Sequence, residues 1–249
     1  MKKHTPTALI TGASQGLGLA LAEALARNGW RLIISARNAK RLRAAMLRLK
    51  KLTKVFAISG DVRDEIHLLQ FAELLEREDL RLDLLVNNAS TLGASPQPPL
   101  LDYEVGDLHR IYHTNVIAPL SLLQKVRPYL GDAATVINIS SDAAAEAYEG
   151  WGGYGASKAA LDHWTAILGK EQPGWHVYAV DPGDMRTEMH QAAFPGEDIS
   201  DRPLPETVAV PALLHLLEVL PKNGRYTAGQ WKPDTTAGEK SQLFLTMLK

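Results

Sequence analysis

Apolar and polar positions alternate in blocks along the chain. Six short apolar runs, rich in β-branched residues, predict strands that are buried on both faces; they span residues 7–11, 31–35, 54–59, 82–87, 134–140 and 175–180. The segments between them show helical spacing, as where Leu42, Met46 and Leu49 share one face of a segment otherwise rich in Lys and Arg. This alternation of strand and helix predicts an α/β protein, with a single doubly wound parallel sheet that carries helices on both faces.

Nothing in the sequence divides the chain. It contains no internal repeat, low-complexity tract or linker rich in Gly, Ser or Pro, and we therefore expect one domain over residues 1–249. Two long segments, residues 91–103 and 183–205, follow predicted strands and are interpreted as loops. Open α/β sheets bind ligands where their strands end. We therefore expect both loops to border a ligand site, with residues 183–205 as a lid over the substrate.

Composition and charge exclude several classes of function. The formal net charge of −1 gives no general attraction to nucleic acid or to anionic membranes, and the basic segment 40–54 is interpreted as the solvated face of a helix. The absence of cysteine excludes disulfides and a cysteine nucleophile, and no apolar run is long enough to span a bilayer. His109 and His113 have a spacing that can chelate a metal, but no third ligand accompanies them. We expect a cytoplasmic protein without metal, nucleic acid or membrane partner.

A glycine-rich stretch, TGASQGLG at residues 11–18, follows the first predicted strand directly. Glycine permits positive φ angles and a close approach of the backbone to a ligand. A helix that begins at about Leu17 offers unpaired N–H groups and a positive dipole end to a phosphate. The stretch therefore predicts the diphosphate cradle of a Rossmann-type fold, and a turn that only packs the strand against the helix is the alternative.

The spacing of these glycines resembles that of the short-chain dehydrogenase/reductase (SDR) family in its single-domain form. Further motifs carry the same resemblance in order along the chain, to about Gly229. They are Gly12, Gly16 and Gly18, then Asp61-Val62, Asn87-Asn88-Ala89, Asn115, Ser140-Ser141, Tyr154 with Lys158, Asp181-Pro182-Gly183 and Thr187. Each motif is unspecific alone, and their order and spacing make the resemblance specific.

The resemblance implies a nicotinamide-dependent oxidoreductase. It assigns the catalytic roles to Asn115, Ser141, Tyr154 and Lys158. The expected cofactor-binding residues are Gly12, Ser14, Gln15, Gly16, Leu17, Gly18, Arg37, Asp61, Val62, Asn88, Ala89, Tyr154, Lys158, Pro182, Gly183 and Thr187. Within this set, Asp61 and Val62 resemble the adenine contact, and Asn88 and Ala89 belong to Asn87-Asn88-Ala89, which resembles the family's backbone-stabilising turn.

The catalytic residue types suit proton transfer. Tyrosine ionises near pH 10, so it acts as an acid or base at neutral pH only if its anion is stabilised. Lys158 shares a helix face with Tyr154, and a cation about 4 Å from the phenolate contributes roughly 4 kcal/mol at an effective dielectric constant of ~20. We therefore expect Lys158 to lower the pKa of Tyr154 to near 7. Ser141 is expected to hold the substrate oxygen, with Ser140 as the competing candidate, and Asn115 resembles the residue that anchors a water near Lys158.

Cofactor choice depends on the end of the second predicted strand, Ser35-Ala36-Arg37-Asn38. An acidic residue there binds the ribose 2′-hydroxyl of NAD(H), whereas an arginine suits the 2′-phosphate of NADP(H). Arg37 therefore predicts that NADP(H) is preferred and that NAD(H) is possible; a solvated Arg37 is the alternative. Gln15 departs from the pattern, because many NADPH-using relatives carry a basic residue just before the middle glycine.

The sequence thus predicts an NADPH-dependent enzyme that reversibly reduces a ketone or aldehyde to an alcohol. Apolar residues in the expected lid favour a neutral, moderately apolar small molecule as substrate. The resemblance also implies a homodimer or homotetramer that associates through the long middle helix and the helix with Tyr154. The alternative is a non-catalytic cofactor-binding scaffold or redox sensor with the same fold.

Overall fold

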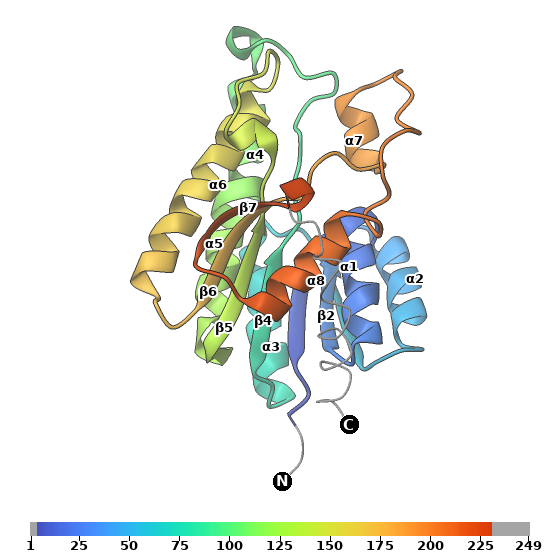
Figure 1. Ribbon diagram of the computed structural model, residues 1–249, viewed down its shortest axis with the longest axis vertical. Coiled ribbons are helices and arrows are strands. Elements are labelled where there is room, and N and C mark those ends of the chain that lie inside the picture. Colours follow the sequence, from blue (N-terminus) through green and yellow to red (C-terminus); the bar gives the residue numbers. More distant parts are fainter. Residues whose placement is uncertain (1–3, 231–249) are drawn as a thin grey trace.

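The fold is built on one parallel sheet of seven strands in the order β3-β2-β1-β4-β5-β6-β7 (Figure 1). The computed structural model describes residues 4–230. The strands are β1 (Thr7–Thr11), β2 (Arg31–Ala36), β3 (Val55–Ser59), β4 (Leu82–Asn87), β5 (Leu130–Ile139), β6 (His176–Asp181) and β7 (Gly224–Thr227). Because β1 pairs with both β2 and β4, the chain changes direction across the sheet between them, and ligands bind at such a switch point.

Helices cover both faces of the sheet, and the predicted fold class is confirmed. One core is formed with α1 (Gly16–Arg27), α2 (Ala39–Leu49) and α8 (Ala209–Val219). The other core lies under α3 (Glu65–Arg77), α5 (Ala118–Val126) and α6 (Gly152–Glu171). The remaining helices are α4 (Val105–Tyr112) and α7 (Glu188–Ala193). Strands of such a doubly covered sheet are buried along their length, which explains their nearly continuous apolar runs.

Most predicted strands agree with the structure to within a residue at each end. β5 begins earlier, at Leu130, because an irregularity in its pairing with β4 near Leu82 adds residues that are not apolar. The prediction of a helix over residues 40–54 is too long, since α2 ends at Leu49 and a turn leads into β3. The sequence analysis missed β7, which is short and only partly buried.

The two segments interpreted as loops contain short helices. Residues 91–103 include a single 3₁₀ turn at Leu100–Asp102, and residues 183–205 include α7, whose first turn is capped by Thr187. Figure 1 shows α7 beyond the ends of the strands, above α1. Among residues 4–230 no helix has the length and apolar character needed to cross a membrane. The ends of the predicted domain, residues 1–3 and 231–249, lie outside the described residues.

Candidate active site

A cleft of about 1020 Å³ crosses the carboxyl edge of the sheet. Arg37 and Asp61 line one end, which we call the adenosine end, and Tyr154 and Lys158 line the other, which we call the reaction end. The structure brings nearly all of the predicted site residues to this cleft: Gly12, Ser14, Gln15, Gly16, Leu17, Arg37, Asp61, Val62, Asn88, Ala89, Ser141, Tyr154, Lys158, Pro182, Gly183 and Thr187. The two others, Gly18 and Asn115, lie behind its wall.

The glycine-rich turn is held by Asn88. Its Nδ2 donates to the carbonyl oxygens of Thr11 and Gly12, at 2.8 and 3.2 Å. A Cβ on Gly18 would lie 2.6 Å from the oxygen of Gly12 and 2.5 Å from Nδ2 of Asn88, so this glycine is required by packing. Gly16, in contrast, has a φ of +55°, which favours glycine, and a Cβ there would only make an ordinary contact of 3.6 Å with Thr187 across the cleft.

This turn fits a diphosphate. α1 begins at Gly16, and the side chain of its N-cap residue, Gln15, makes no capping hydrogen bond. The first N–H groups of α1 therefore remain available at the positive end of the helix dipole, where an anion is stabilised. Among the described residues no group of three or more acidic or histidine side chains is arranged to hold a metal ion.

The adenosine end carries two arginines. Arg37 is exposed just after the end of β2, and Arg41 lies in the first turn of α2. Nη1 of Arg41 donates to Oε1 of Gln15 and, at 2.8 Å, to Oε2 of Glu188 at the start of α7. Gln15 also donates to Glu188, at 3.1 Å. We call these three residues, Gln15, Arg41 and Glu188, the mouth bridge, because they join α1, α2 and α7 across the cleft.

The sequence analysis missed Arg41. No helical spacing relates Arg41 to Arg37, because Arg37 lies before α2 begins at Ala39. The approach of Arg41 to Gln15 depends on how α2 packs beside α1. The structure thus places the guanidinium of Arg41 beside Gln15. Asp61 has an arginine of its own: Arg63 donates to both carboxylate oxygens and lowers the pKa of Asp61 to about 2.

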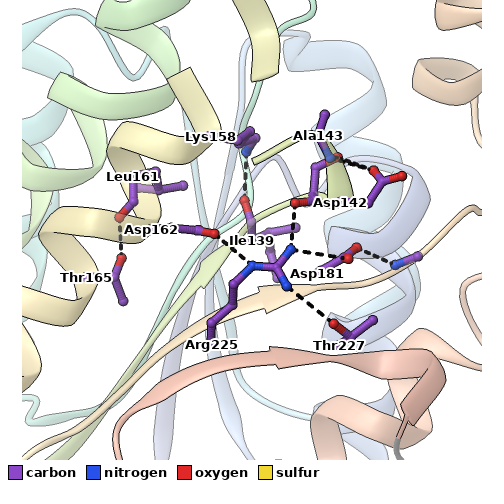
Figure 2. Close-up of polar contacts among 12 residues, drawn as sticks. Ile139, Asp142, Ala143, Lys158, Leu161, Asp162, Thr165, Asp181, Arg225 and Thr227 are labelled. Atoms are coloured by element: carbon purple, nitrogen blue, oxygen red, sulfur yellow. Dashed lines mark hydrogen bonds and ion pairs between the residues drawn. The ribbon is translucent and has the colours of Figure 1, made fainter. Parts of the chain in front are cut away.

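At the reaction end, α6 buries Tyr154 and Lys158, which are 8% and 2% exposed. Nζ of Lys158 lies 5.5 Å from the centre of the tyrosine ring and donates to the carbonyl oxygen of Ile139 at 2.7 Å (Figure 2). Burial lowers the pKa of Lys158 to about 8, because the interior of the protein disfavours the ammonium ion.

The predicted lowering of the pKa of Tyr154 is wrong. Burial raises this pKa above its usual value, and the carboxylates of Asp142 and Asp181 raise it further. Hydrogen bonding with Ser141 and Ser90 lowers it by less. The desolvation of the phenolate outweighs the stabilisation that the neighbouring hydroxyl groups provide. The phenol is therefore protonated at neutral pH.

Ser141 and Ser140 both line the cleft but differ in exposure. Ser140 is buried at the end of β5, where its N–H donates to Val180. The hydroxyl of Ser141 donates to Oδ1 of Asp142 at 2.8 Å and accepts from the N–H of Ala143 at 3.2 Å. The contact of Ser141 with Tyr154 favours Ser141 over Ser140 as the substrate-binding serine.

Asn115 lies in a π-helical turn, residues His113–Ile117, between α4 and α5. Its Oδ1 accepts from the hydroxyl of Ser90 and the N–H of Thr91, and its Nδ2 donates to the carbonyl of Thr91 and the hydroxyl of Ser157, all at 2.9 to 3.0 Å. Asn115 therefore joins the loop after β4 to α6 beside Lys158. π-Bulges of this kind are frequent at functional sites.

An apolar wall stands over Tyr154. Trp151 packs edge-on against the ring of Tyr154, with ring centroids 5.7 Å apart. It also packs on Phe194, which follows α7, with ring centroids 5.8 Å apart. Leu92 and Met189 join the same cluster. Segments 91–103 and 183–205 thus meet above the reaction end, as expected for loops that border a ligand site.

The switch-point cleft, the glycine turn and the parallel sheet together define a dinucleotide-binding α/β protein. The family model described as short chain dehydrogenase matches residues 6–198, and the chain belongs to this family of NAD(P)-dependent oxidoreductases.

Among curated proteins, sulfoacetaldehyde reductase 2 of Chromohalobacter salexigens is 35% identical over 186 residues, which cover 73% of each chain. A 3-oxoacyl-[acyl-carrier-protein] reductase of rhamnolipid biosynthesis from Pseudomonas aeruginosa is 35% identical over 191 residues, again 73% of each chain. A short-chain dehydrogenase of Shigella flexneri, solved with NADP, has a TM-score of 0.81 and 26% identity, and the match covers 90% of this chain and 97% of that one.

Proposed function

We propose that this protein reduces a ketone or aldehyde to an alcohol with NADPH, in a reversible reaction. One observation carries the proposal: a single cleft joins two cationic side chains at its adenosine end to Ser141, Tyr154 and Lys158 at its reaction end. A cofactor-binding scaffold or redox sensor would have no chemical need for Ser141, Tyr154 and Lys158 together.

The residues of the reaction end divide the work of proton transfer. NADPH, when bound, supplies a hydride to the carbonyl carbon. The hydroxyl of Ser141 exchanges its hydrogen bond to Asp142 for one to the carbonyl oxygen, and the phenol of Tyr154 gives that oxygen its proton. The raised pKa of Tyr154 suits this direction, because reduction starts from the protonated phenol. Lys158, when protonated, stabilises the resulting phenolate, and Asn115 fixes the loop and helix around it.

The adenosine end supports a preference for NADPH over NADH. Arg37 and Arg41 both line the cleft where β2 ends, and a guanidinium forms charge-assisted hydrogen bonds with a phosphate that NADH lacks. Asp61 is already paired with Arg63, so it does not compete for Arg37, whereas Arg41 is shared with Glu188 and can turn part of its guanidinium to the 2′-phosphate.

The reaction end also restricts the substrate. Its wall is aromatic and aliphatic, and the carboxylates of Asp142 and Asp184 line the cleft beside it. Like charges repel across such a site, so we propose a neutral, moderately apolar carbonyl compound as substrate.

A panel of aldehydes and ketones, followed by the loss of NADPH absorbance with NADH in parallel, tests the proposal. We expect turnover with a neutral aromatic or medium-chain carbonyl compound and faster reaction with NADPH. Binding of NADPH without turnover across the panel would support the scaffold or sensor instead.

We further propose one domain that associates as a homodimer or homotetramer. Exposed apolar side chains support this: Val105 begins α4, Ile117 directly precedes α5, Leu120 lies in the first turn of α5, and Ile167 lies on α6. Light scattering at micromolar concentration tests the proposal, and a monomer would contradict it. The cytoplasmic location stays a prediction.

A further inference from the structure

Arg225, on the edge strand β7, contacts three other elements behind the reaction end (Figure 2). Its Nε donates to Oδ2 of Asp162 on α6 at 2.9 Å. Its Nη2 donates to the carbonyl oxygen of Ser141 at 2.8 Å and lies 3.4 Å from Oδ2 of Asp181 at the end of β6. The fourth contact, from Nη1 to Thr227 at 3.5 Å, stays within β7.

The three partners outside β7 line or adjoin the reaction end. Asp162 follows Lys158 by one turn of α6. Asp181 is buried, and its other carboxylate oxygen accepts the N–H of Gly183 at 2.9 Å, which fixes the turn that lines the cleft. The backbone of Ser141 carries the hydroxyl that we propose for the substrate oxygen. One guanidinium therefore holds three separate walls of the site in place.

We infer that Arg225 is a positioning residue for carbonyl reduction: it sets Ser141 and the Pro182-Gly183 turn against the helix that carries Tyr154 and Lys158. This inference rests on the proposed function. A forked guanidinium can hold a carbonyl and two carboxylates at once, and lysine cannot reproduce that geometry. A misplacement of about 1 Å at reacting atoms can cost on the order of 100-fold in rate.

Arg225 also balances charge around the proton donor. The groups that face Tyr154 are Lys158 on its own helix, Ser141 and Asp142 after β5, Asp181 at the end of β6, and Ser90 after β4. The carboxylate of Asp181 raises the pKa of Tyr154, and that of Asp162 raises the pKa of Lys158. Because Arg225 pairs with both carboxylates, its removal should raise both pKa values.

The test compares wild type with Arg225→Gln and Arg225→Lys, and with Arg48→Gln as a control that removes an arginine–carboxylate pair between α1 and α2. We expect Arg225→Gln to lower kcat for reduction about 10- to 100-fold, with KM for NADPH changed less than about threefold because the adenosine end is intact. Alcohol oxidation needs the phenolate of Tyr154. The midpoint of the pH profile of kcat for oxidation should therefore rise by about half a pH unit or more in Arg225→Gln.

Arg225→Lys keeps the charge, so we expect its pH midpoint near that of wild type and a loss of kcat of about 3- to 10-fold. If Arg225→Gln does not fold, the loss of kcat in Arg225→Lys still supports the inference, provided that Arg225→Lys melts at the same temperature as wild type. Two results would overturn the inference. The first is a kcat of either variant within twofold of wild type. The second is a lower kcat of Arg225→Gln that comes with a lowered melting temperature and an unchanged pH midpoint. Wild type without turnover would overturn the proposed function as well, whereas active wild type with an unaffected Arg225→Gln would overturn only the positioning role.

Discussion

The two ends of the cleft use charge in opposite surroundings. At the adenosine end the side chains of Arg41 and Glu188 are 50% and 66% exposed, and they meet as an ion pair in water. At the reaction end Lys158 is 2% exposed and donates to a backbone carbonyl. Exposed pairs are screened by salt and contribute about 0.2–1 kcal/mol, whereas burial moves the pKa of Lys158 from 10.5 to about 8.

This difference separates the functions of the two ends. A shift of this size corresponds to roughly 3 kcal/mol between the protonation states of Lys158, so the reaction end should respond to pH. The adenosine end should respond to ionic strength, since its charges remain in contact with solvent. Changes at the buried end should therefore have larger effects than matched changes at the exposed end.

The largest effect is expected for Tyr154→Phe. The substitution keeps the ring that packs on Trp151 and removes the hydroxyl that supplies the proton, so we expect kcat to fall by about 1000-fold or more. Binding of NADPH, measured by fluorescence titration, should be nearly unchanged. Retention of more than about a tenth of wild-type kcat would remove Tyr154 from the mechanism.

At the exposed end, the double variant Ala36→Asp with Arg37→Ala should reverse cofactor preference. One charge-assisted hydrogen bond from Arg37 to the 2′-phosphate contributes roughly 1.5 to 3 kcal/mol, so wild type should prefer NADPH about 10- to 150-fold in kcat/KM. The new carboxylate should repel the phosphate and accept from the ribose hydroxyl of NADH. The measurement is kcat/KM for both cofactors at fixed salt, and equal use of both by wild type would show that Arg37 is only a solvated surface residue.

The free energy of unfolding should reveal the desolvation penalty of the buried ammonium group of Lys158. The folded-state pKa of Lys158, about 8, lies below its ordinary value of 10.5, so the unfolded chain binds the extra proton. The penalty is therefore complete below pH 8 and disappears as the pH rises through 10.5. Lys158→Met should remove it, offset partly by the lost hydrogen bond to Ile139, with a net gain of about 1 kcal/mol and about 2–4 °C in Tm at pH 7.

The matched control for this measurement is Lys170→Met, an exposed position on the same helix. It should leave both Tm and its pH dependence unchanged. A lower Tm in Lys158→Met than in wild type at pH 7 would mean that the hydrogen bond to Ile139 outweighs the desolvation of the ammonium ion.

The sequence predicted what local pattern controls. β1 and β4 are largely apolar runs and could be placed to the residue, while β7 has four residues, one of them Arg225, and no apolar period marks it. The choice of Tyr154 and Lys158 followed from the resemblance to the family, and their shared helix face followed from their spacing. The pKa of Tyr154 did not, because it depends on burial, which spacing alone does not determine.

Contacts that are distant along the chain were equally hidden. Arg225 meets the carbonyl of Ser141 across 84 positions, and Arg41 meets Glu188 across 147. Such contacts depend on the order of strands in the sheet and on the path of the loop after β6. A single sequence therefore identified the residues that carry the chemistry better than the residues that hold them in place.

The smallest effect is expected at the mouth bridge. Glu188 occupies the guanidinium of Arg41 at 2.8 Å, so its carboxylate should compete with a 2′-phosphate for that side chain. Glu188→Gln should lower KM for NADPH about 1.5- to 5-fold, as expected for release of an exposed ion pair of 0.2–1 kcal/mol, and should leave KM for NADH unchanged. The effect should disappear at high salt. Glu23→Gln, which breaks the exposed pair with Arg48 away from the cleft, is the control. An equal change for both cofactors would instead assign the effect to movement of α7, because only NADPH carries the phosphate that Arg41 would bind.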